Sequence, residues 1–99
     1  MTLHIFSSSP ANLTLLEECC RALREGDALI VLGEAVHAAA EGSAAAKLLE
    51  SLPAAISLHV LSEDCSARGV GRLPARFVAS DYSAFVALAC AHARSVSWF

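Results

Sequence analysis

Residues 28–32 read Ala-Leu-Ile-Val-Leu, an unbroken apolar run that Gly33 closes. The run has the length of a strand, and its lack of alternating polar residues is typical of a central parallel strand buried on both faces. Parallel strands need a crossover connection, usually a helix, between one strand and the next. The run therefore predicts an α/β sheet in which strands and helices alternate along the chain.

The segments on either side follow this alternation from end to end. Short apolar runs bounded by Ser, Gly or Pro predict further strands, and amphipathic or Ala-rich stretches between them predict helices. The whole pattern predicts a single-domain (1–99) three-layer α/β sandwich, with a mostly parallel sheet of four to five strands and right-handed crossovers. The predicted strands span 3–6, 28–32, 56–61, 76–79 and 95–99, and the predicted helices span 12–25, 34–52 (broken near Gly42), 62–69 and 81–92.

The composition favours one compact domain that meets other chains. Of the 99 residues, 56% are hydrophobic and 17% are charged, so the chain carries more apolar surface than a small domain can readily bury, and we expect it to self-associate. At the end of the chain, Trp98 and Phe99 either fold back on the core or anchor an interface. The net charge of −3, with only seven Lys plus Arg, gives no basic surface for nucleic acid, and direct nucleic acid binding is not expected.

Targeting signals and ligand motifs are sparse. The stretch 1–10 does not resemble a signal peptide, and no run reaches the roughly 18 apolar residues of a membrane span, so we expect a cytoplasmic protein that binds no membrane. Ligands of parallel sheets collect beyond the carboxyl ends of the strands, here 7–10, 33–37 and 62–65, but none of these segments has a phosphate-binding pattern. The four histidines lack metal-ligand spacing, and no serine lies in a nucleophile elbow. We expect no cofactor and no metal.

The adjacent pair Cys19-Cys20 is the most unusual feature of the sequence. On a helix, neighbouring side chains point about 100° apart, so the two thiols cannot share one role. The apolar stripe formed by Leu13, Leu16, Cys20 and Leu23 predicts that Cys20 packs in the core and that Cys19 lies at the boundary with solvent. Cys19 is then either a reactive thiol or an inert boundary residue.

The other two cysteines have weaker claims to chemistry. Cys65 lies in the first turn of a predicted helix that Ser62 would cap, and a helix N-terminus lowers a thiol pKa. The acids Glu63 and Asp64 oppose that shift. Cys90 is expected to be a packing residue of the last helix.

Several short pieces stand in a specific order along the 99 residues. They are Leu3-His4 followed by Ser9-Pro10, Glu25-Gly26-Asp27-Ala28-Leu29 before the apolar strand, Glu63-Asp64 with Ala67-Arg68-Gly69, Asp81-Tyr82 with Phe85-Val86, and the closing Trp98-Phe99. In this order and spacing the chain resembles, from end to end, the TusB/DsrH family of small sulfur-relay subunits.

The resemblance implies a DsrE-like α/β fold and a complex of three related subunits, two copies each, that passes persulfide sulfur between cysteines. In the Tus branch the partners are TusC/TusD-like and the sulfur ends in 2-thiouridine at tRNA wobble positions. In the Dsr branch the partners are DsrF/DsrE-like and the sulfur belongs to the oxidation of stored sulfur. We favour the Tus branch because tRNA thiolation is the more widespread use of the family.

The resemblance also assigns a site. DsrH-like members have a cysteine seven residues before the Gly that ends the first helix, and Cys19 has that position relative to Gly26, which makes Cys19 the candidate persulfide carrier. Many TusB-like members lack this cysteine and look non-catalytic. The chain also departs from the family after the second strand, where Glu34-Ala35 replaces the usual Asp-Gly. The rival hypothesis is a non-catalytic oligomeric scaffold in which all four cysteines are inert.

Overall fold

The computed structural model describes residues 1–99 and contains one sheet of five strands in the order β4-β3-β2-β1-β5. Every neighbouring pair in the sheet is parallel, as the apolar run at 28–32 predicts. The chain builds the sheet outward from β1 to β4 on one side and then adds β5 on the other, so β1 lies between β2 and β5. The strands are β1 (Thr2–Phe6), β2 (Ala28–Val31), β3 (Ser57–Leu61), β4 (Phe77–Ser80) and β5 (Arg94–Trp98).

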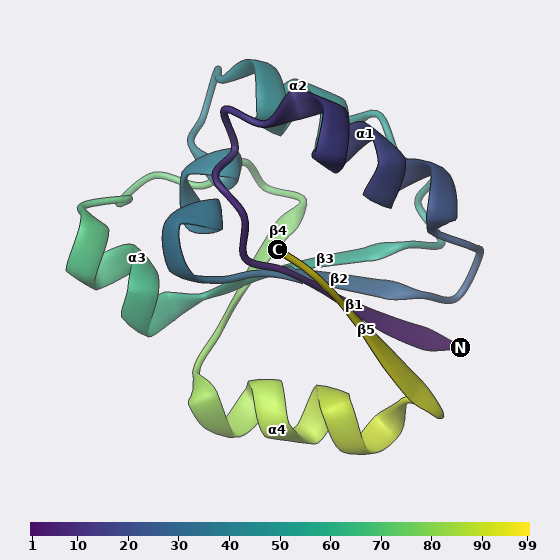
Figure 1. The fold of residues 1–99 in the computed structure, drawn as a ribbon. Coiled ribbons are helices and arrows are strands. Elements are labelled where there is room, and N and C mark those ends of the chain that lie inside the picture. Colours follow the sequence, from purple (N-terminus) through teal and green to yellow (C-terminus); the bar gives the residue numbers. More distant parts are fainter.

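Helices cover both faces of this sheet and make it the middle one of three layers (Figure 1). On one face lie α1 (Leu13–Ala22) and α2 (Ala44–Glu50), together with the short 3₁₀ helix η1 (Gly33–Ala39). The opposite face carries α4 (Tyr82–Ala91), and α3 (Ser62–Arg68) follows directly after β3. The predicted fold class is confirmed.

Local chemistry explains where most helices begin and end. The side chain of Asn12 accepts a hydrogen bond from the amide of Leu15 and begins α1, and Asp81 begins α4 in the same way, as predicted for Asp81. The expected break at Gly42 separates η1 from α2, since Gly42 has a φ of +83°. Two predictions are wrong: α1 ends at Ala22, about a turn before Gly26, and Ser62 is already helical and caps nothing.

The two faces of the sheet differ in how much they bury. The larger core lies under α1, η1 and α2 and includes Phe6, Leu16 and Val31, all fully buried. The smaller one, under α4, has three buried residues, Leu3, Ala28 and Ile30, against which Phe85 and Leu88 pack. No residue of α4 is itself buried, and Tyr82 and Val86 are exposed, so one side of α4 presents apolar groups to solvent. No helix has the length and apolar character needed to cross a bilayer.

A chain of buried polar groups ties β5 to the centre of the sheet. The indole N–H of Trp98 donates to Nδ1 of His4 at 3.1 Å, and the two rings stack with centroids 6.2 Å apart. With Nδ1 accepting, Nε2 of His4 carries the proton and faces Oδ2 of Asp27 at 3.4 Å. The carboxylate of Asp27 also accepts the backbone N–H groups of Thr2 and Arg24, each at 2.9 Å.

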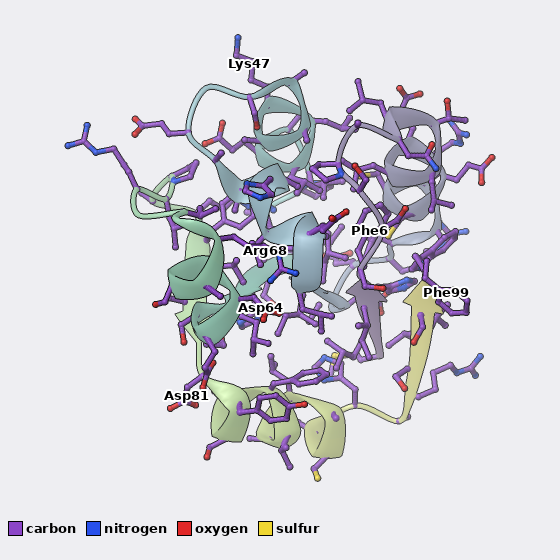
Figure 2. All side chains as sticks on the ribbon, turned by 60° about the vertical axis from the view of Figure 1, so that its left-hand side comes forward. Phe6, Lys47, Asp64, Arg68, Asp81 and Phe99 are labelled. Atoms are coloured by element: carbon purple, nitrogen blue, oxygen red, sulfur yellow. The ribbon has the colours of Figure 1, made fainter.

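This arrangement decides the role of the two C-terminal aromatics within the chain. Trp98 folds back and packs against the larger core, whereas Phe99 is 89% exposed at the end of β5 (Figure 2). Burial by itself would raise the pKa of Asp27, but the two amide hydrogen bonds and the hydrogen bond from His4 hold that pKa below its ordinary value. The Asp27 carboxylate therefore stabilises the junction of β1, β2 and β5 in its ionised form.

Candidate functional site

The thiol pair of α1 is oriented opposite to the prediction. Cys19 is fully buried, between Leu16 and Leu23 on the core side of α1, and Cys20 is half-buried. The predicted stripe fails because it counts Leu13, which is the first residue of α1 and is exposed. At 100° per residue, Leu13 points roughly 90° away from the direction shared by the three buried residues. Cys19 is thus a core residue of α1 and Cys20 is the boundary residue.

The surroundings of Cys19 disfavour its reactive form. Its side chain is 0% exposed and belongs to the larger core. Burial raises the pKa of the Cys19 thiol to about 12, and the neighbouring Cys20 contributes to the same shift. The thiolate is the nucleophile in sulfur chemistry, so Cys19 in this conformation is an unreactive thiol.

Cys20 opens into a cavity of about 350 Å³ on the surface between α1 and the C-terminal end of α2. The wall from α1 consists of Glu17, Cys20 and Arg21, and the opposite wall consists of Leu48, Ser51 and Leu52. Burial raises the pKa of Cys20, Glu17 raises it further, and the guanidinium of Arg21 lowers it. This cavity combines a thiol, a cation and two apolar side chains, and its volume is in the range of small-ligand sites.

The remaining cysteines also differ from expectation. Cys65 is buried in the first turn of α3, and burial, followed by the charge of Asp64, raises its thiol pKa, so the helix N-terminus does not activate it. Cys90 is exposed on α4 and is not a packing residue. Its exposure follows from the position of α4, which contacts the sheet through Phe85 and Leu88 and leaves its other side uncovered.

The carboxyl ends of the strands, where a ligand crevice is expected, are closed by the chain itself. The backbone N–H of Gly33, after β2, donates to Oδ2 of Asp64 at 2.6 Å. Asp64 also lies 3.8 Å from Arg68, its neighbour on α3 (Figure 2). Next to β1, both the amide and the hydroxyl of Ser7 bond to the carbonyl of Trp98. The cavity of the structure lies instead on the α1–α2 face.

Two further features concern metal binding and the turn after β2. No group of three or more His, Cys, Asp or Glu side chains is placed to hold a metal ion. Glu34-Ala35 stands where the family shows Asp-Gly after the second strand, and Ala35 is fully buried in η1. The glycine of this chain is Gly33, directly before Glu34, and it has a φ of +60°. A glycine therefore still makes the turn out of β2, displaced by two positions along the chain.

Sequence reasoning missed the cavity beside Cys20. Its walls come from segments about 30 residues apart, and their contact depends on how α1 and α2 pack, which helical periodicity does not report. One signal was present in the sequence. The spacing of Leu16, Cys19 and Leu23, at three and four residues, fits an apolar helical stripe as well as the predicted stripe that contains Cys20.

Comparisons with known proteins place this domain. The crystal structure of the ychN protein from Escherichia coli superposes with a TM-score of 0.80 over 97% of both chains, at 13% sequence identity. Protein TusB of E. coli O6:K15:H31 is 39% identical over 98 residues, which cover 97% of this chain and 99% of that protein. Protein TusB of Salmonella arizonae is 41% identical over 80 residues, covering 79% of this chain and 81% of that protein.

The five-stranded parallel sandwich with a thiol pair on its first helix is a small DsrE-like α/β domain, as the resemblance implied. The model of the family described as DsrH like protein matches residues 8–95. The chain belongs to this DsrH family, together with its TusB relatives, and the family membership indicates a sulfur-relay subunit.

Proposed function

We propose that this chain is a subunit of a cytoplasmic sulfur-relay complex that serves the 2-thiolation of tRNA wobble uridine. The observation that carries the proposal is the near full-length similarity to proteins named TusB, at 39% identity over 98 residues. The partners in this proposal are TusC/TusD-like chains of the same fold. A DsrH-like role in sulfur oxidation, with DsrF/DsrE-like partners, is the alternative that the family name DsrH supports.

The surface of the domain supports a role within an assembly. The exposed side of α4 carries Tyr82, 61% exposed, and Val86, and no residue of α4 is charged. Phe99 adds a large exposed aromatic at the end of the edge strand β5. Exposed apolar groups of this kind are typical of surfaces that another subunit covers.

The chemical role falls on the thiol pair of α1. The family position assigns the persulfide to Cys19, and for that role α1 would have to move, because Cys19 is fully buried. A relay subunit whose own thiols stay inert, with the partners supplying the catalytic cysteine, is the scaffold form of the same proposal. Both forms place this chain in the complex, and they differ in whether it ever carries sulfur.

The test of the proposal is genetic and chemical. Deleting the gene in its host should lower 2-thiouridine in digested tRNA, as measured by liquid chromatography and mass spectrometry, and the tagged chain should co-purify with two related DsrE-like chains. A plasmid copy should restore the modification. Unchanged 2-thiouridine together with impaired oxidation of stored sulfur would favour the Dsr branch, and a tagged chain that recovers no related subunit would overturn the relay assignment.

A further inference from the structure

We propose that the sulfur-accepting thiol of this chain is Cys20, in the cavity between α1 and α2, and that its substrate is the persulfide of a donor protein. This inference rests on the proposed function and moves the site from the family position, Cys19, to its neighbour. The structure separates the two thiols sharply, since Cys19 is 0% exposed while Cys20 lines an open cavity of about 350 Å³.

Access is the first argument. A donor sulfur must reach the acceptor thiol along the line of the sulfur–sulfur bond that breaks, and Cys20 offers such an approach through the cavity mouth. To offer Cys19 instead, α1 would have to rotate or detach, and either motion would expose Leu16 and Leu23, which are buried with it. Cys20 needs no rearrangement of the fold.

The lining of the cavity is the second argument. Burial and the Glu17 carboxylate raise the pKa of Cys20, and the guanidinium of Arg21 beside it partly offsets that rise, so this cation favours the attacking thiolate and also the persulfide anion that forms. On the opposite wall, Leu48 and Leu52 give the cavity an apolar side against which a bound sulfur can pack. Burial, followed by the charge of Glu17, opposes thiolate formation and holds the resting thiol protonated.

The transfer step balances without an added oxidant or reductant. The thiolate of Cys20 attacks the outer sulfur of the donor persulfide, a bond forms between this sulfur and Sγ of Cys20, and the sulfur–sulfur bond of the donor breaks. The donor cysteine leaves as a thiolate and takes up the proton that Cys20 released. In a second displacement, the thiolate of an acceptor attacks the outer sulfur of the Cys20 persulfide, the sulfur–sulfur bond breaks, and Cys20 leaves as a thiolate that takes up the proton released by the acceptor.

The other thiols provide internal controls. Cys65 is buried, and burial raises its pKa. Cys90 is exposed on the opposite face of the sheet, on α4, and does not line the cavity, so it reports non-specific reactivity. A Cys90→Ser background removes this accessible thiol without touching the core.

The experiment loads the full chain, in the Cys90→Ser background and in complex with its relay subunits, with a persulfide-bearing donor protein. Tandem mass spectrometry of the peptide that holds both thiols then locates the added sulfur. We expect the sulfur on Cys20, its retention in Cys19→Ala and its loss in Cys20→Ser. A brief maleimide pulse on the native chain should modify Cys20 at least about tenfold faster than Cys19, because Cys19 is 0% exposed whereas Cys20 lines the open cavity.

A matched pair of variants tests the cavity itself. Glu17→Gln removes the carboxylate that raises the pKa of Cys20 and should speed loading a few-fold, whereas Glu18→Gln, an exposed neighbour that does not line the cavity, should leave the rate unchanged. Sulfur on Cys19, or loss of loading in a folded Cys19→Ala variant, would overturn the inference and leave the relay function intact. No sulfur on either thiol, while a relay partner in the same tube is loaded, would overturn it in favour of the scaffold form. Failure to assemble with any related subunit is a separate outcome that overturns the proposed function and this inference together.

Discussion

Replacing each thiol of the α1 pair by serine should affect stability very unequally. Cys19 is fully buried in the larger core together with Leu16 and Leu23, so Cys19→Ser places a hydroxyl in an apolar cluster. A buried hydroxyl without a partner costs about 1–3 kcal/mol of the free energy of unfolding. Cys20→Ser changes a half-buried side chain at a cavity that water reaches, and the expected cost is within about 0.5 kcal/mol.

Urea denaturation followed by circular dichroism, at pH 7 with a reductant present, measures both costs. With a denaturant slope of about 1–2 kcal/mol per molar for a domain of this size, the Cys19→Ser midpoint should fall by about 0.5–3 M and the Cys20→Ser midpoint by at most about 0.5 M. The melting temperature of Cys19→Ser should fall by about 4–8 °C for each kcal/mol lost. Equal shifts, or a larger loss for Cys20→Ser, would refute the orientation of α1 on which the site is built.

Four further substitutions test other parts of the structure. Because the pKa of Asp27 is lowered in the folded state, its stabilising effect is complete above the ordinary value of 3.8 and is lost as the pH falls through the folded-state value. Asp27→Asn should therefore unfold more easily at pH 7, yet lose less stability than the unmodified chain below about pH 4. Urea titrations at several pH values measure both effects. Trp98→Phe removes the N–H donated to His4 and should lower the free energy of unfolding by about 1 kcal/mol. Phe99→Ala should leave the free energy of unfolding unchanged and should weaken self-association, as measured by sedimentation velocity. The opposite pattern would mean that the two aromatics have been assigned the wrong roles. The guanidinium of Arg76 donates hydrogen bonds to the carbonyls of Glu50, Leu52, Pro53 and Ile56. Arg76→Lys should lower the free energy of unfolding by about 1–2 kcal/mol, because one ammonium group cannot bond to all four carbonyls. An unchanged melting temperature would contradict that role.

The strands of this protein could be predicted from local sequence because their signals are local. The run at 28–32 is apolar at every position, and only a strand covered on both faces buries such a run, so the parallel sheet followed from it. Asp81 was equally predictable as a helix start, because its side chain satisfies a backbone N–H within its own turn.

The site was less predictable because it depends on which face of α1 meets the sheet. Leu13 and Leu16 both fit an apolar stripe, and only the packing of the chain shows that Leu13 lies at the solvent-facing start of α1. Counting Leu13 turned the predicted stripe toward Cys20, whereas Leu16 and Leu23 alone lie equally far from both thiols on the helix. The bond between Trp98 and His4 joins positions 94 residues apart, a separation over which no local pattern operates.

The central claim, that this chain takes part in sulfur relay through a thiol of α1, has one most direct test. The complex formed with its related subunits is incubated with a persulfide-loaded donor, and the intact mass of this chain is recorded before and after treatment with a reductant. We expect a gain of one sulfur atom that the reductant removes and that disappears in the Cys19→Ala/Cys20→Ser double variant. An unchanged mass, under conditions in which a partner subunit of the same complex gains its sulfur, would contradict it.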